Sequence, residues 1–207
     1  MEHLVEDFAR KRGSLTFVQI GAYDGVTSDN IHALILKHKW SGILVEPITE
    51  PFRKLQVNYA SVPGLKFEQA AITEHDGEVT MYRVREDVPG LPSYADRVHS
   101  LKREITLKEI GGRADALAAV TVPALTLSSL LKKYGFDQVD VLAIDTEGAD
   151  FEIIRQIDFS RVKPSLIIYE HKHLSMSDKH GCGELLSQQN YAIHPFAQDT
   201  VAVLRSA

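Results

Sequence analysis

The sequence has a single cysteine and no long apolar run, and each absence excludes a class of protein. Cys182 is the only cysteine, so no disulfide can form within the chain, which suits a reducing compartment. No apolar run approaches the roughly 18 residues of a membrane-spanning helix, and the charged N-terminal segment MEHLVEDFARKRG lacks the apolar core of a signal peptide. We therefore expect a cytoplasmic protein with no membrane partner.

The sequence also lacks an excess of positive charge. It has 23 Lys and Arg residues against 28 Asp and Glu residues, a net charge of −5, and the two signs are interspersed. This balance offers no broad basic face for a phosphate backbone, so we expect no nucleic-acid partner. No internal repeat or low-complexity tract occurs, and 207 residues with 44% hydrophobic content suffice for one core. We predict a single domain over residues 1–207.

Apolar runs of strand length alternate with helical patterns along the chain. The runs are FVQI, GILVE, LKFEQAAI, VDVLAID and SLIIYE, near residues 17, 42, 65, 139 and 165. Their continuous apolarity is typical of strands buried on both faces, which predicts an α/β fold with a mostly parallel sheet and helices on both faces. Near the C-terminus, YAIHPF and TVAVLR predict a hairpin that closes the sheet with one antiparallel strand.

Two segments interrupt this alternation. HDGEVTMYRV follows the third run and predicts a short antiparallel extension of the sheet, with Asp76 and Gly77 forming the turn. Residues 85–118 are rich in turn residues and then in helix formers, which predicts an insertion or lid. Ser93, Tyr94, Arg97 or His99 could reach a substrate from this insertion. The alternative, favoured for any single one of them, is a solvated loop with ordinary surface charges.

The stretch TFVQIGAYDGVTSDN at residues 16–30 places glycines where the first strand ends. Ligands of open parallel sheets bind at this edge, and Gly21 and Gly25 allow a sharp turn and a close approach of the backbone to a ligand. The next helix, expected to begin near Ser28 or Asp29, adds free amide donors. The alternative is that the glycines only form a turn between strand and helix.

The second strand adds a carboxylate to this loop. GILVEP places Glu46 about twenty residues beyond the glycines, where an acidic side chain can accept both hydroxyls of a ribose. Glu46 could instead cap the helix after Pro47. A nicotinamide dinucleotide would need G-x-G-x-x-G, whereas Tyr23 and Asp24 put a ring and a negative charge at the pyrophosphate position. A cationic sulfonium suits this loop better, so S-adenosylmethionine is the predicted cofactor.

These motifs resemble those of FkbM-type S-adenosylmethionine-dependent methyltransferases. The stretches that carry the resemblance are VQIGAYDGVTSDN, ILVEP, QAAITEHDGEVTMY, VPALTLSSLLKKYG and, most specifically, VDVLAIDTEGADFEIIRQID, and they run through almost the whole chain. The resemblance implies a class I methyltransferase Rossmann-like fold with a seven-stranded sheet. It also implies O-methylation of a hydroxyl on a sugar, glycan or polyketide-like small molecule, and leaves the oligomeric state open.

Carried over to this chain, the resemblance implies specific cofactor contacts. The loop glycines and their neighbours would line the methionine and ribose portions, Glu46 would accept the ribose hydroxyls, and Pro47 with Ala70–Ile72 would border the adenine. The predicted cofactor residues are Gly21, Ala22, Tyr23, Asp24, Gly25, Asn30, Glu46, Pro47, Ala71, Ile72 and Asp145. The chain departs from the family pattern at three positions: Gln19 replaces an acidic residue, Ala143 a lysine and Ser128 an aspartate.

Charged residues follow two buried strands and define a second group of candidates. The carboxyl ends of adjacent parallel strands meet at one edge of a sheet, and buried charges are costly unless they are paired or liganded. If the strand of SLIIYE continued, His171 and His173 would share one face and Glu170 the other. A histidine or carboxylate there would take the proton of the acceptor hydroxyl. The predicted catalytic residues are Asp145, Glu147, Glu170, His171 and His173.

Other interpretations of this second group stay open. Glu147 also stands in the first turn of an expected helix, where an acidic side chain favours the helix dipole. Two carboxylates and a histidine could hold a divalent ion, but no compact spacing such as H-E-x-x-H occurs, so no metal is predicted. The alternatives to a methyltransferase are an NAD-dependent oxidoreductase on a similar fold and a noncatalytic nucleoside-binding module.

Overall fold

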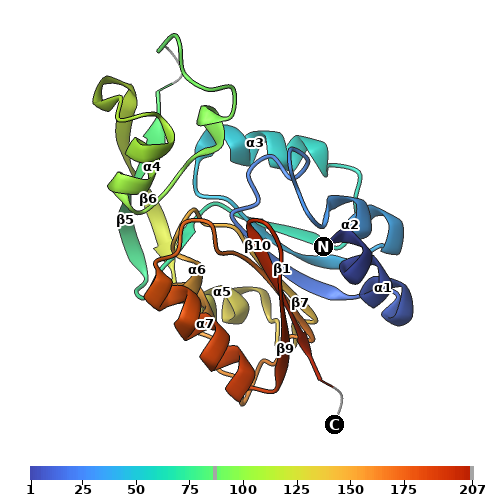
Figure 1. Cartoon of the computed structure of the whole chain (residues 1–207). Coiled ribbons are helices and arrows are strands. Elements are labelled where there is room, and N and C mark those ends of the chain that lie inside the picture. The colour runs from blue at the N-terminus through green and yellow to red at the C-terminus, as the bar shows by residue number, and fades with distance from the viewer. Residues whose placement is uncertain (86–87, 206–207) are drawn as a thin grey trace.

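In a computed structural model that describes residues 1–85 and 88–205, seven strands form a central sheet between two layers of helices (Figure 1). In spatial order the strands are β3 (Leu65–Glu68), β2 (Ser41–Val45), β1 (Thr16–Ile20), β7 (Val141–Ile144), β8 (Leu166–Glu170), β10 (Asp199–Leu204) and β9 (Tyr191–Pro195). Strand β10 runs antiparallel to β8 and β9, and the pairs from β3 to β8 are parallel. The expected parallel sheet with one antiparallel strand is confirmed.

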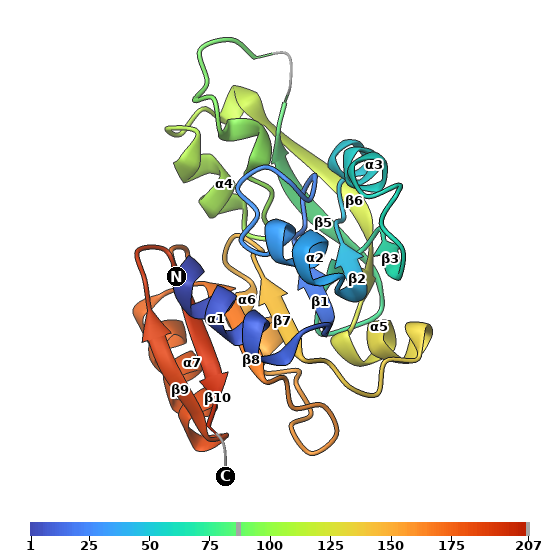
Figure 2. The same cartoon turned by 90° about the vertical axis from the view of Figure 1, so that its right-hand side faces the viewer.

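The strands are buried on both faces because their residues feed two cores. Val18 and Ile20 of β1 face the core under α5 (Leu127–Tyr134), α6 (Asp150–Ile154) and α7 (Met176–Gln188). Phe17 faces the opposite core, under α1 (Glu2–Arg12), α2 (His32–His38) and α3 (Thr49–Asn58). Period-two alternation within a continuously apolar run therefore divides each strand between the two helix layers. Figure 2 shows one of these layers, with α1 and α2 in front of the sheet.

Short polar side chains begin the helices that follow the strands. Asp29 accepts hydrogen bonds from the amides of Ile31 and His32, at 2.7 and 2.8 Å, and α2 begins at His32, three or four residues later than expected. Thr126 and Ser175 accept from amides in the first turns of α5 and α7, both at 3.1 Å. These caps satisfy amides that would otherwise lack partners at the helix ends.

A second, three-stranded sheet corrects two expectations. LKFEQAAI is not one strand, and HDGEVTMYRV does not extend the main sheet. Strand β4 (Ala71–Ile72) instead pairs in parallel with β6 (Leu117–Leu125), and β5 (Gly77–Val84) pairs with the other edge of β6 in antiparallel fashion. Strand β6, to which β4 and β5 pair, was not predicted from the sequence, because Pro123 and several alanines give this stretch a weak strand pattern.

The predicted insertion at 85–118 packs beside this second sheet, next to the carboxyl ends of the parallel strands (Figure 1). It contains two short 3₁₀ turns, Ala95–Arg97 and Ala114–Ala116, and helix α4 (Arg103–Glu109), and it shares a small apolar cluster with β5. Glu86 and Asp87, which belong to the predicted lid, lie outside the described residues. That the insertion opens and closes as a lid stays a prediction. The single domain over residues 1–207 also stays a prediction. No helix of the described ranges has the length and apolarity to span a bilayer.

Candidate functional site

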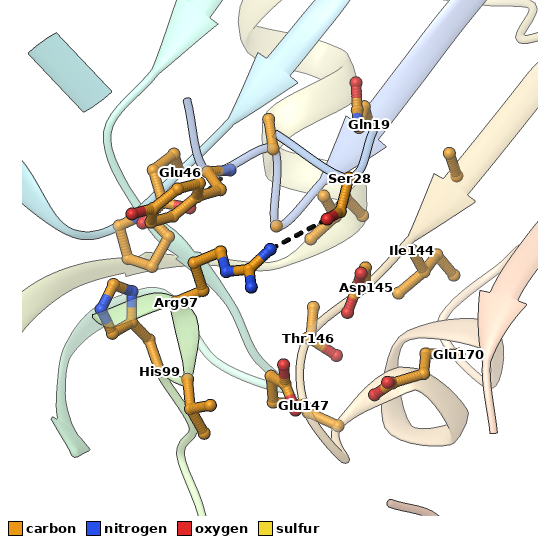
Figure 3. Close-up of a pocket in the computed structure, with 18 of the residues that line it drawn as sticks. Gln19, Ser28, Glu46, Arg97, His99, Ile144, Asp145, Thr146, Glu147 and Glu170 are labelled. Carbon is orange, nitrogen blue, oxygen red and sulfur yellow. Dashed lines mark hydrogen bonds between the residues drawn. The ribbon is translucent and has the colours of Figure 1, made fainter. Parts of the chain in front are cut away.

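A cavity of about 630 Å³ lies at the carboxyl ends of the parallel strands. Its walls come from the loops after β1, β2, β7 and β8 and from the insertion. Figure 3 shows Glu46 on one side of this cavity and Asp145, Glu147 and Glu170 on the other. We call these sides the Glu46 end and the acidic end. The volume is typical of sites for small molecules and cofactors.

The loop after β1 depends on Gly21. This residue has φ of +81°, and its amide donates to Val45 O at 3.0 Å. A Cβ at this position would lie 1.7 Å from the carbonyl oxygen of Asp145, so no side chain fits without a backbone shift. Tyr23 and Ser28 also have positive φ, 47° and 58°, which non-glycine residues rarely adopt. Strain of this kind concentrates at functional loops.

Glu46 is held at the end of β2 by two backbone amides. Its Oε2 accepts from Tyr23 N at 3.0 Å and its Oε1 from Ile48 N at 2.8 Å, and only 3% of the residue is exposed. Burial raises the pKa of Glu46 to about 7, against the opposing effect of the two amides. Each carboxylate oxygen keeps acceptor capacity on the cavity side, which is the geometry that a pair of vicinal hydroxyls requires.

The position of Gln19 was noted in the sequence, but its partner was not. Gln19 Nε2 donates to Asp29 Oδ2 at 2.8 Å, and both residues line the cavity. Gln19 Oε1 is buried without a hydrogen-bond partner. Burial raises the pKa of Asp29. The family pattern has an acidic residue at position 19, whereas in this chain Asp29, ten residues later, brings a carboxylate to the cavity wall. The position of Asp29 just before α2 was the sequence feature that could have identified it.

Two predicted cofactor residues lie away from the cavity wall. Asp24 accepts from the amides of Val26 and Thr27 and from the Thr27 hydroxyl, at 3.0, 2.7 and 2.7 Å. A Cβ on Gly25 would meet Leu55 and Tyr59 rather than the cavity. Both residues therefore shape the loop from within, and the expected contact of Asp24 with a ligand ammonium has no support in this geometry.

The other predicted cofactor residues do line the cavity. They are Gly21, Ala22, Tyr23, Asn30, Glu46, Pro47, Ala71, Ile72 and Asp145. Apolar side chains from the second sheet and the insertion extend the wall near Ala71, namely Met81, Val98 and Leu101. A flat aromatic ring such as adenine would find an apolar surface here. Sequence reasoning missed this extension because it comes from the second sheet.

The acidic end brings three carboxylates together. Asp145 and Glu147 follow β7, and Glu170 ends β8. Burial and the nearby charge of Glu147 raise the pKa of Asp145 well above its usual range. Burial and the carboxylates of Asp145 and Glu147 raise the pKa of Glu170 to about 10. Like charges this close repel one another, and a positive charge placed among them would relieve the repulsion.

The loop that carries Glu147 is braced by the insertion. Ser100 Oγ donates to the carbonyl of Glu147 at 2.7 Å, and Lys102 Nζ donates to the carbonyl of Gly148 at 2.6 Å. Glu147 has a φ of +53° and Gly148 a φ of +105°. The bracing holds this strained turn, which directs the Glu147 side chain into the cavity. Neither Ser100 nor Lys102 could be assigned to the site from the sequence, because they lie more than forty residues away.

The two predicted histidines separate. His171 and His173 would share a face only if the strand continued, but β8 ends at Glu170 and the chain then turns. His171 Nδ1 lies 2.9 Å from Thr200 Oγ1, and His171 does not line the cavity. The His173 side chain is 4% exposed, and its Nε2 lies 2.8 Å from Glu147 Oε2. Only His173 therefore joins the acidic end.

The insertion lines one side of the cavity and makes polar contacts with the loop after β1. Arg97 Nη1 donates to Ser28 Oγ at 2.9 Å (Figure 3), and the Tyr23 hydroxyl donates to Asp96 at 3.1 Å. Tyr94, Arg97 and His99 line the cavity as expected, whereas Ser93 lines a smaller neighbouring pocket of about 330 Å³. Lys172 and Glu109, which the sequence did not indicate, complete the wall at the acidic end and form an ion pair at 3.2 Å.

A model of the methyltransferase FkbM domain matches residues 19–194, which include every strand of the main sheet except part of β1, the last residue of β9 and all of β10. The chain belongs to this family. The predicted fold class is confirmed, and the family implies S-adenosylmethionine as the cofactor.

Solved structures show the same fold at low identity. A crystal structure of methyltransferase FkbM from Methylobacillus flagellatus KT matches with a TM-score of 0.57 and 14% identity, over 92% of this chain and 43% of that one. Precorrin-6y C5,15-methyltransferase from Geobacter metallireducens GS-15 matches with a TM-score of 0.50 and 12% identity, over 99% and 87%. The METTL16 methyltransferase domain matches with a TM-score of 0.52 and 11% identity, over 99% and 66%. Among curated proteins no significant match is found.

Proposed function

We propose that this chain transfers the methyl group of S-adenosylmethionine to a hydroxyl group of a sugar, a glycan or a polyketide-like small molecule. The observation that carries the proposal is a single cavity with Glu46, placed to accept ribose hydroxyls, at one end and the carboxylates of Asp145, Glu147 and the buried Glu170 at the other. The family supports the methyl transfer. The acidic end supports a hydroxyl acceptor, because a hydroxyl must be oriented and must lose a proton as it attacks.

The residues at the Glu46 end fit the cofactor. Gly21 lacks the side chain that would block the approach between the loops after β1 and β7. The carboxylate of Glu46 would accept the ribose hydroxyls, because two amides already fix its orientation. The free acceptor Gln19 Oε1 would receive the cofactor's ammonium group, a contact that leaves no buried oxygen without a partner there.

The residues at the acidic end would handle the acceptor. The cofactor, when bound, supplies an electrophilic methyl group on a sulfonium. The chain contributes the placement of the attacking oxygen and a path for its proton. Glu147 lines the cavity and would accept the proton of the acceptor hydroxyl, and His173, whose Nε2 lies 2.8 Å from Glu147 Oε2, would hold that carboxylate in position. The insertion, joined to the β1 loop through Arg97 and Ser28, shields this reaction from water.

Calorimetric titration with S-adenosylmethionine, S-adenosylhomocysteine and NAD, measured in parallel, tests the cofactor. We expect saturable binding of the first two alone, followed by methylation of at least one member of a panel of hydroxylated sugars, glycans and polyketides. Binding of NAD alone would favour an oxidoreductase. Binding of S-adenosylmethionine without turnover on any acceptor would favour a noncatalytic module.

A further inference from the structure

Three side chains at the acidic end converge in a way that methyl transfer by itself does not require. Glu147, Glu170 and His173 each offer one potential ligand atom, and these atoms lie within 4.8 Å of one another. Atoms that share one divalent cation at bond lengths of about 2.0–2.6 Å lie at most roughly 4–5 Å apart. The separations between the ligand atoms of Glu147, Glu170 and His173 fall within that limit. Figure 3 shows Glu147 and Glu170 near each other on one side of the cavity, with the Glu170 carboxylate directed toward Glu147.

The same three side chains hold most of the buried polar atoms that lack partners. In the described parts of the chain, five buried side-chain atoms have no hydrogen-bond partner, and three of them are Glu147 Oε2, Glu170 Oε2 and His173 Nε2. Glu170 is 7% exposed and the His173 side chain 4%. Nε2 of His173 lies 2.8 Å from Glu147 Oε2 without the alignment of a hydrogen bond. Buried polar groups almost always have partners, so a cluster of three indicates a missing one.

The neighbouring cations do not fill this role. Lys172 Nζ pairs with Glu109 at 3.2 Å, and Lys102 Nζ pairs with Glu152 at 2.9 Å and with the carbonyl of Gly148. Both ammonium groups are therefore directed at other partners. A group that satisfies these atoms has to carry positive charge and bind two carboxylate oxygens and one imidazole nitrogen. It also has to be small enough to contact all three atoms at once.

We propose that Glu147, Glu170 and His173 bind a divalent metal ion of the kind that accepts mixed oxygen and nitrogen ligands, such as Mn²⁺ or Zn²⁺. Carboxylates suit Mn²⁺ and imidazole suits Zn²⁺, and a set of three protein ligands leaves coordination positions open. Glu147 and Glu170 line the cavity, so the open positions face it. Ser100 and Lys102 act as braces of the Glu147 turn and keep its carboxylate in place without the ion.

The ion would give the acceptor hydroxyl a binding position. An oxygen bound to a divalent ion loses its proton more readily than a free hydroxyl does, and its location becomes fixed. This part of the inference rests on the function proposed above, whereas the binding of the ion does not. The two can therefore fail separately.

Titration of the full chain with Mn²⁺, after treatment with a chelator and followed by electron paramagnetic resonance and calorimetry, tests the site. We expect one Mn²⁺ per chain, displaced by Zn²⁺, and at least about tenfold weaker binding in Glu147→Gln and His173→Gln. His180→Gln is the matched control, because His180 also lies near a glutamate, Glu184 at 3.3 Å, but on an exposed helix surface. It should bind Mn²⁺ as the unchanged chain does.

The outcomes separate the proposals. Absence of saturable Mn²⁺ and Zn²⁺ binding by the folded chain, or unchanged binding in both variants, overturns the metal site. If His173→Gln fails to fold, Glu147→Gln alone decides, because its side chain is less buried. Metal binding also has to raise the thermal unfolding temperature of the unchanged chain and not that of Glu147→Gln. If S-adenosylmethionine binds and Mn²⁺ does not, the methyltransferase proposal stands; if Mn²⁺ binds and S-adenosylmethionine does not, the metal site stands alone.

Discussion

The two ends of the cavity differ in how their polar groups find partners. At the Glu46 end the chain satisfies nearly all of them: Glu46 accepts from two amides, and Asp29 accepts from two amides and from Gln19. At the acidic end, one buried atom each of Glu147, Glu170 and His173 has no hydrogen-bond partner, although His173 Nε2 lies 2.8 Å from Glu147 Oε2. Buried polar atoms are costly without partners. The fold therefore satisfies the polar groups of the Glu46 end except Gln19 Oε1, whereas at the acidic end the divalent ion proposed above would supply the partner of three buried atoms.

The sharpest way to break the Glu46 end is Gly21→Ala. The new Cβ would overlap the carbonyl oxygen of Asp145, and the positive φ would add strain. We expect a loss of roughly 2–4 kcal/mol of unfolding free energy and no measurable cofactor binding. Urea denaturation and calorimetry measure the two effects.

Gly183→Ala is the matched control for that substitution. Gly183 lies in α7, and a Cβ added there would have no atom within 4 Å, so alanine should raise stability by up to about 1 kcal/mol. Equal effects of the two substitutions would mean that the close approach at Gly21 is unimportant.

At the acidic end, the two histidines should separate in activity as they do in space. We expect His173→Ala to lower the turnover number by roughly 100-fold or more with little change in cofactor affinity, because His173 lies beside Glu147. His171→Ala should lose only its contact with Thr200, about 1 kcal/mol of stability, and turn over normally. Steady-state kinetics of both variants provide the test, and equal loss of turnover would contradict the separation.

Glu46→Gln should weaken cofactor binding without disturbing the acidic end. The amide keeps the size of the side chain but replaces a charged acceptor of the ribose hydroxyls, which corresponds to about 1–3 kcal/mol. Calorimetry with S-adenosylhomocysteine measures the change, and Mn²⁺ affinity serves as the internal control because it should stay the same. Unchanged cofactor affinity would remove Glu46 from the site.

The raised pKa of Glu46 predicts a pH dependence of stability. Because burial raises this pKa from 4.5 to about 7, the folded chain holds the proton more tightly than the unfolded chain. The contribution of Glu46 to stability is then fully present below about pH 4.5 and is lost as the pH rises through 7. Relative to the unchanged chain, Glu46→Gln should gain on the order of 2–3 kcal/mol of unfolding free energy between pH 5 and 8.

Urea denaturation of both proteins at pH 5, 6, 7 and 8 measures this difference. Asp150 is present in both proteins, so its own pKa, which burial also raises to about 7, cancels in the comparison. A constant difference across the pH range would show that Glu46 does not titrate there.

The sequence predicts the Glu46 end better than the acidic end. Gly21 and Glu46 were found because each stands directly after an apolar run, and the edge of a parallel sheet brings such positions together. Asp24 and Asp29 show the limit of this reasoning. Both are aspartates in the same loop, but Asp24 turns back onto Val26 and Thr27, while Asp29 caps α2 and faces the cavity.

The tertiary structure decided how the acidic end is assembled. The sequence placed Glu170, His171 and His173 together, but the end of β8 at Glu170 sends His171 toward Thr200 and His173 toward Glu147. Ser100 and Lys102, from an insertion more than forty residues away, brace the turn that carries Glu147.

By itself, the sequence determined the alternation of strands and helices and the place of the ligand edge, because apolar period and helix caps are local properties of the chain. It did not determine the second sheet, in which β6 joins β4 to β5, or the convergence of Glu147, Glu170 and His173. Those depend on which distant strands pair and on where each strand stops. Backbone hydrogen bonds between segments far apart in the chain decide which strands pair and where each strand ends, and the local pattern of apolar residues does not predict these bonds.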